Sequence, residues 1–222
     1  WARTEGNPKL LELSVSALAT MRPGNQSYFV DSLARKGDIR DYVMNNVYAA
    51  LTPDEQTMMG ALSVFAGAIE REGAEDILAA AGVNNIAPRI DALINKHVVS
   101  ETDEYLHLHS LVRDYCYHVL NRHERLHYHQ LAAEYFEASR NYISAAYHQF
   151  EQKAYGTSLN LLAGHSQAII NAGGAGNLLE QLNRFRREEL SPEQRVTLDK
   201  ARGDCHRLRG EYPAAIQAYE AA

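Results

Sequence analysis

The chain has 222 residues, of which 45% are hydrophobic and 23% are charged, a profile typical of a globular protein with a buried core. The 22 Lys and Arg against 28 Asp and Glu give a formal net charge of −6, which disfavours a surface that binds polyanions through bulk charge. Apolar runs fall far short of the ~20 residues that span a bilayer. The two cysteines, Cys116 and Cys205, are far apart in the sequence, which excludes a disulfide scaffold. We therefore expect a cytoplasmic protein without membrane contact.

Helical periodicity dominates the first fifty residues. Leu10, Leu13 and Ala17 recur at three- and four-residue steps, which predicts an amphipathic helix that ends near Arg22-Pro23-Gly24. A second helical stretch covers residues 38–50. We interpret residues 1–50 as one helical part of the chain.

Residues 51–121 have the pattern of a winged helix. Thr52 can cap a helix in which Glu55 completes a capping box, and helices are predicted over residues 71–81 and 87–96. The period then changes to that of strands. Val98-Val99, a polar turn over 100–104 and the alternating residues 105–109 predict a β-hairpin, after which helical spacing resumes at Leu111.

Residues 122–222 are helical throughout, with faces rich in Ala and Tyr. The run from Gly210 to Ala215, with Tyr219 and Ala222 after it, fits the tetratricopeptide helix-turn-helix repeat of ~34 residues. The glycine-rich stretch 173–176 has no following Lys and no preceding strand, so it is predicted to be a loop and not a phosphate-binding turn. The predicted fold is mainly α: a winged-helix domain with a short β-hairpin, followed by tetratricopeptide-like repeats that are cut short.

The order of these parts resembles the region that follows the P-loop domain in STAND signalling ATPases, the group that includes the NB-ARC proteins. Three stretches carry the resemblance: Gly6-Asn7-Pro8-Lys9-Leu10 before the first helix, Leu62-Ser63-Val64-Phe65 in the winged helix, and residues 108–115 at its end. The resemblance covers the whole chain. It implies that residues 1–50 end a nucleotide-binding module, and that this chain is a fragment of a longer protein whose P-loop domain precedes Trp1.

The resemblance also implies a nucleotide site. Gly6 and Pro8 match the turn that lies beside the adenine and ribose, where Gly permits a close backbone approach and Pro offers a flat apolar face. His109 matches the histidine that contacts the β-phosphate of ADP, and Ser110 stands where the strictest pattern has Asp. An imidazole can donate a hydrogen bond to a phosphate oxygen. The ordinary structural interpretations are a turn before a helix and a histidine that caps a strand-to-helix junction.

By resemblance, the chain is a non-catalytic regulatory segment of a STAND-type ATPase. The winged helix contacts ADP in the inactive state, and the repeats sense a protein or a small ligand, which makes a two-state switch. ADP or ATP would bind only together with the upstream P-loop domain of the same chain, and the segment alone has no cofactor and no enzymatic activity. The rival hypothesis is a stand-alone scaffold that binds proteins without any link to a nucleotide.

Two enzymatic or DNA-binding alternatives carry recognisable patterns. His123-Glu124-Arg125-Leu126-His127 reads H-E-x-x-H, the pattern of zinc proteases, whose histidines lie one helical turn apart. We reject it because Arg122 and Arg125 flank and interrupt the motif. The predicted helix 87–96 would be the DNA-reading helix of a winged helix, but it contains Asp91, and an acidic turn over 101–104 would repel phosphates.

The remaining charged and aromatic residues receive no ligand. Arg184, Arg186 and Arg187 lie beside Glu188 and Glu189, which predicts a solvated helix face. Spacing identifies no partner for a set of further histidines: His97, His107, His118, His129, His148, His165 and His206.

Overall fold

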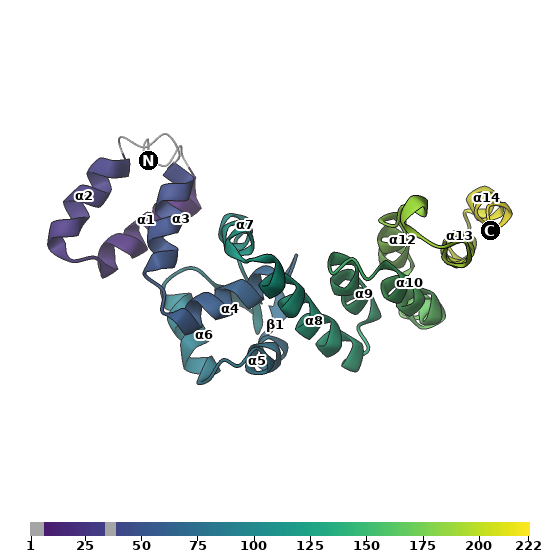
Figure 1. The fold of residues 1–222 in the computed structure, drawn as a ribbon, viewed down its shortest axis with the longest axis horizontal. Helices are drawn as coiled ribbons and strands as arrows, with labels where there is room; N and C mark the ends of the chain where they lie inside the picture. The colour runs from purple at the N-terminus through teal and green to yellow at the C-terminus, as the bar shows by residue number, and fades with distance from the viewer. Residues whose placement is uncertain (1–6, 34–38) are drawn as a thin grey trace. The chain divides into compact units, whose positions relative to one another are not determined.

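The computed structural model of the protein describes residues 7–33 and 39–222, without the side chain of Thr20, and its ribbon is shown in Figure 1. These ranges contain fourteen α-helices and one small antiparallel sheet, so the fold is mainly α, as predicted. The chain divides into two compact units, Trp1–Tyr128 and His129–Ala222. The division falls inside α8 (Arg122–Ala138), and the predicted three-part division at 50 and 121 stays a prediction.

The first unit opens with three helices, α1 (Pro8–Thr20), α2 (Pro23–Leu33) and α3 (Ile39–Ala49). α1 packs against α3, and Leu13 is fully buried. The sequence analysis placed only a helix end at Pro23 and missed α2. Its pattern is hard to recognise because only Phe29 and Leu33 of its residues are buried.

The winged helix follows in the same unit, with its elements in the predicted order. Its helices and strands are α4 (Pro53–Ser63), β1 (Ile69–Glu70), α5 (Arg71–Ala80), α6 (Ile86–Asn95), β2 (Ser100–Thr102), β3 (Tyr105–His107) and α7 (Ser110–Val119). The sheet has the antiparallel order β1-β3-β2. Leu106 of β3 pairs with Ile69 on one side and with Glu101 on the other, and its side chain is buried.

The hairpin differs from its prediction by about two residues. Val98 and Val99 are buried but precede the first strand, and the turn is formed by Asp103 and Glu104, whose φ angles are 51° and 67°. Two consecutive residues with positive φ produce the tight turn that matches strand twist. The polar run predicted as a loop is therefore mostly strand.

Local start and stop signals of the winged helix are confirmed. The Thr52 N–H donates to Glu55 Oε2 at 2.7 Å, and the Glu55 N–H donates to Thr52 Oγ1 at 3.3 Å, so the capping box begins α4. Gly82 has a φ of +84° just after α5, as a helix-ending glycine requires. The core beneath these helices contains Met58, Leu62, Ile77, Ile90, Leu93 and Val112.

The second unit consists of helical hairpins. After α8 come α9 (Tyr142–Glu151), α10 (Tyr155–Gly164), α11 (Ser166–Asn171), α12 (Ala175–Asn183), the 3-10 helix η2 (Arg187–Glu189), α13 (Pro192–Leu208) and α14 (Tyr212–Glu220). Their shared core includes Leu159, Leu162, Leu178, Leu182, Leu198 and Cys205. The stretch 173–176 is a loop only at its first two residues, because α12 begins at Ala175.

One turn recurs three times in this unit. Arg140, Lys153 and Gly210 all have positive φ angles, of 60°, 64° and 77°, and a tyrosine follows each of them two residues later at the start of a helix. Only the last turn has a glycine, the residue by which the sequence indicates such a turn.

Small residues also allow close helix contact as predicted, since a Cβ on Gly203 of α13 would lie 2.4 Å from the Tyr219 ring of α14.

Candidate functional site

The first turn of α1 contains part of the predicted nucleotide site. Asn7 caps the helix, because its Oδ1 accepts from the backbone N–H groups of Lys9 at 3.0 Å and Leu10 at 3.1 Å. Pro8 follows at the first helical position, where its missing N–H costs nothing, and it is exposed. Gly6, the other residue predicted there, lies outside the described residues.

His109 lies at the junction between the sheet and α7. It is the N-cap of α7, and its Nδ1 accepts from the Leu111 backbone N–H at 3.3 Å. An Nδ1 that accepts is unprotonated, so a neutral ring carries its proton on Nε2. The side chain is exposed, and Ser110 is the first residue of the helix. His109 therefore caps the junction and still presents a donor to solvent.

The residues that follow Pro8 in α1 include an ion pair. The Lys9 ammonium donates to Glu12 Oε2 at 2.8 Å, and this hydrogen bond is the largest influence that lowers the pKa of Glu12. Burial acts in the opposite direction and raises that pKa. Pro8 and His109 both belong to the first unit.

The H-E-x-x-H motif has a structural role at the start of α8. The Glu124 N–H donates to Asn121 Oδ1 at 3.0 Å, and the Asn121 N–H donates to Glu124 Oε2 at 2.8 Å, which is a capping box. His123 and His127 are exposed, and the Arg125 guanidinium lies 4.8 Å from the centre of the Tyr117 ring. Within residues 7–33 and 39–222, no group of three His, Cys, Asp or Glu side chains could hold a metal ion.

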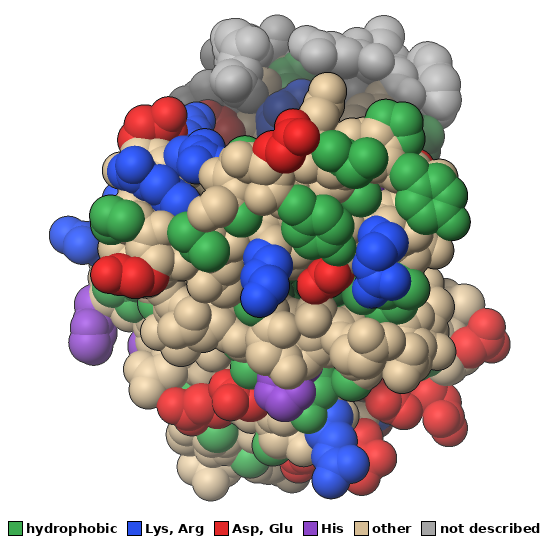
Figure 2. Space-filling view, turned by 90° about the vertical axis from the view of Figure 1, so that its right-hand side faces the viewer, with side chains coloured by type: hydrophobic (Ala, Val, Ile, Leu, Met, Phe, Trp, Pro, Cys, Tyr) green, Lys and Arg blue, Asp and Glu red, His purple; other side chains and the backbone are tan. Residues whose placement is uncertain are grey.

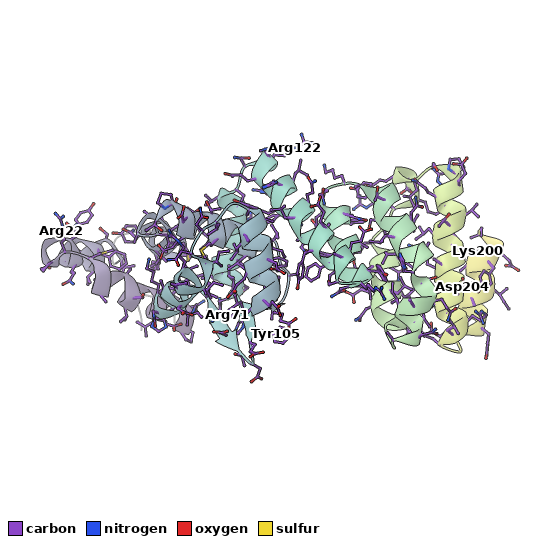
Figure 3. All side chains as sticks on the ribbon, turned by 90° about the horizontal axis from the view of Figure 1, so that it is seen from below. Arg22, Arg71, Tyr105, Arg122, Lys200 and Asp204 are labelled. Carbon is purple, nitrogen blue, oxygen red and sulfur yellow. The ribbon has the colours of Figure 1, made fainter. Side chains whose placement is uncertain are left out.

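Cations at α6, at its C-cap Lys96 and at the start of α5 are paired with carboxylates of the same unit. Arg89 forms an ion pair with Asp54 at 2.5 Å, and Lys96 forms one with Glu55 at 2.5 Å. Arg71, labelled in Figure 3, contacts Asp91 at 2.8 Å and Glu101 at 2.9 Å. A DNA backbone would have to compete with these carboxylates for the cations.

Two histidines for which spacing identified no partner form a buried pair in the second unit. His129 Nδ1 of α8 and His148 Nδ1 of α9 lie 2.9 Å apart, and each residue is only 2% exposed. Burial lowers the pKa of His129 to about 4 and the pKa of His148 to about 3. Both rings are therefore neutral at pH 7, and one donates to the other. The positions 129 and 148 lie on separate helices, so no local pattern indicates the pair.

The arginines near residue 186 were predicted to form a solvated face, and Arg186 and Arg187 are exposed, whereas Arg184 is half-buried. Arg184 pairs with Glu151, and its guanidinium lies 4.2 Å from the centre of the Phe150 ring. Arg187 pairs with Asp199, whose side chain is only 5% exposed. The neighbouring glutamates in the sequence suggested local pairing, whereas the ion-pair partners Glu151 and Asp199 come from other helices.

A hollow of about 520 Å³ lies at the turn between α8 and α9. Asn141, Tyr142 and Ile143 line it on one side, and Ala168 and Ile169 of α11 line it on the other. At the end of the array, the C-terminal helices in Figure 2 carry hydrophobic side chains interspersed with charges of both signs. Exposed apolar residues of α14 are Tyr212, Ile216 and Tyr219.

Comparison with known proteins gives one informative likeness. No family model and none of the curated proteins searched matches the chain. Among solved structures, the chain is similar to a Signal Transduction ATPase with Numerous Domains (STAND) protein with a tetratricopeptide repeat sensor from Pyrococcus horikoshii, with a TM-score of 0.65 and 17% identity. The two proteins share a helical fold over this region.

The likeness covers nearly all of this chain but only part of the archaeal protein. It covers 98% of this chain and 30% of the archaeal protein, so this chain spans less than a third of the length of the STAND protein. At 17% identity the likeness shows a shared mainly helical fold. None of the helices in the described ranges combines the length and the apolar character that a bilayer-spanning segment needs.

Proposed function

We propose that this chain is a non-catalytic regulatory segment of a STAND-type signalling ATPase. In this proposal the winged helix contacts ADP through His109, with Gly6 and Pro8 beside the nucleoside, and an upstream P-loop domain of the same chain supplies the rest of the site. The helical repeats sense a protein or a small ligand. ADP binding favours the inactive state, and the sensed ligand favours the active state, because each binds one state better than the other.

The position of His109 carries the proposal. Its Nδ1 is used by the Leu111 amide, so the imidazole is held in one orientation with Nε2 directed elsewhere. The side chain is exposed at the N-terminus of α7, where the helix dipole favours an anion. A phosphate placed there would gain a donor from the ring and a favourable field from the helix.

The test uses the longer protein with its upstream P-loop domain. His109→Asp is the most informative variant, because a carboxylate still accepts from the backbone at the N-cap but repels a phosphate. We expect the variant to fold normally and to lose at least about tenfold in ADP retained after purification, measured by chromatography of the released nucleotide. His123→Asp, on an exposed histidine of α8, is the matched control.

An unchanged ADP content in His109→Asp would contradict the proposed contact. The rival function is a protein-binding scaffold without a nucleotide, and the exposed apolar side chains of α14 favour it. The two are separated by the reading frame that precedes Trp1. A strand–turn–helix with a Gly-x-x-x-x-Gly-Lys-Ser/Thr turn supports the regulatory segment, and its absence supports the scaffold.

A further inference from the structure

Side chains of α1 bind the carbonyl groups at the end of α6, although the two helices are about eighty residues apart in the chain. Ser16 Oγ donates to the Lys96 carbonyl at 3.0 Å, and Lys9 Nζ donates to the His97 carbonyl at 2.8 Å. These carbonyls follow the last turn of α6 and have no partner within the helix. His97 has a φ of 59° at this point, so the chain turns sharply there.

A carboxylate completes the contact. Glu12 accepts from Lys9 at 2.8 Å through Oε2 and lies 3.0 Å from His97 Nδ1 through Oε1. The Lys9 side chain is only 12% exposed, so its ammonium is held between the carboxylate and the carbonyl. We call this set of residues, Lys9, Glu12 and Ser16 of α1 with Lys96 and His97, the clasp.

The chemistry of the clasp suits a specific contact. The C-terminal end of a helix carries partial negative charge, and the Lys9 ammonium lies against it. Lys96 is anchored in turn, since its Nζ pairs with Glu55 Oε1 at 2.5 Å, and Glu55 belongs to the capping box of α4. The clasp therefore connects α1 through the end of α6 to the first turn of α4.

Other contacts between the first three helices and the winged helix leave room. Tyr115 of α7 donates to Asn45 Oδ1 of α3 at 2.7 Å, but a groove of about 600 Å³ lies between α3 and α7. A second, small cavity of about 30 Å³ lies beside Ser16, Leu51 and Lys96 of the clasp region. Incomplete packing gives this contact little rigidity of its own. Directional hydrogen bonds then decide how the two parts are held.

We infer that the clasp positions His109 relative to Pro8. Pro8 begins the helix that carries Lys9, Glu12 and Ser16, and His109 belongs to the winged helix that the clasp holds. Lys9 and Ser16 are positioning residues, and they act on the nucleotide only through this geometry. The inference depends on the proposed function for its significance, but the clasp itself exists without a nucleotide.

The test measures a distance in the 222-residue chain, in the absence of nucleotide. Spin labels are placed at Asn25→Cys in α2 and Asp76→Cys in α5, both exposed, while the native Cys116 and Cys205 are buried. Pulsed electron paramagnetic resonance then reports the separation of the two helices. In the parent we expect one narrow distribution. In Lys9→Met with Ser16→Ala, we expect the ratio of separated to clasped molecules to rise by about tenfold or more.

Matched variants keep the result interpretable. Arg22→Met removes the same charge from an exposed side chain after α1, labelled in Figure 3, and must leave the distribution narrow. Lys9→Arg retains a charged donor and should restore most of the narrow distribution. Circular dichroism shows whether the double variant folds. If it does not, Ser16→Ala alone replaces it in the test, because this substitution changes the side-chain volume little.

The inference is overturned if the distance distribution stays narrow in the double variant. If the double variant is unfolded, the same result in folded Ser16→Ala overturns it. Equal broadening in Arg22→Met also overturns it, because charge loss alone would then be the cause. The outcome does not depend on ADP. An unchanged ADP content in His109→Asp would therefore count against the proposed function, and the distance measurement would still test the clasp.

Discussion

Acidification should destabilise the second unit through its buried histidine pair. His129 and His148 have an ordinary pKa of 6.5 in the unfolded chain, and burial lowers their pKa to about 4 and about 3 in the folded chain. The unfolded chain therefore binds more protons than the folded one below pH 6.5, so stability falls as the pH falls. At 1.36 kcal/mol per unit, each imidazole costs roughly 2 kcal/mol between pH 6.5 and pH 5.

Urea unfolding followed by circular dichroism measures this effect. The free energy of unfolding is determined at pH 7.5, 6 and 5 for the parent and for His129→Leu with His148→Leu, which has no imidazole to titrate at these positions. The parent should lose several kcal/mol more than the variant over this range. Comparing the two removes the contribution of carboxylates, since these titrate in both proteins.

Equal pH dependence in the parent and in the double leucine variant would show that the pair is hydrated or charged in the folded state, contrary to its 2% exposure. His127→Ala is the control for histidine titration in general. Its side chain is exposed on the same helix, so the variant should keep the pH dependence of the parent. Glu151, the charged group that raises the pKa of His129, opposes the effect of burial and does not reverse it.

Two further variants test packing and capping, both by the urea midpoint. Gly203→Ala should lower the free energy of unfolding by about 1–3 kcal/mol, because its Cβ would lie 2.4 Å from the Tyr219 ring. Gly176→Ala is the control and should not destabilise the protein, because no atom lies within 4 Å of its Cβ, and equal values for the two variants would contradict the close helix contact. Thr52→Ala should cost about 1 kcal/mol through loss of the N-cap acceptor for Glu55, and an unchanged midpoint would mean that water replaces it fully.

For the candidate site, sequence reasoning identified types of residue but not their surroundings. His109 was expected either as a phosphate ligand or as a cap, and the structure shows that it is a cap with an exposed ring. The nucleotide role of His109 and Pro8 stays a prediction. Lys9, Ser16 and the end of α6 received no role, because a contact across about eighty residues leaves no mark on local spacing.

The sequence by itself determined the helices and their boundaries where the signal is local. The capping box at Thr52 joins residues three apart, and it was predicted correctly because the backbone and side chains that form it lie within one helical turn. Only the tertiary structure decided the two-residue strand β1, the pair of His129 with His148, and the ion pair of Arg187 with Asp199. Those contacts join separate elements, and their energy comes from burial and partners that no short stretch of sequence contains.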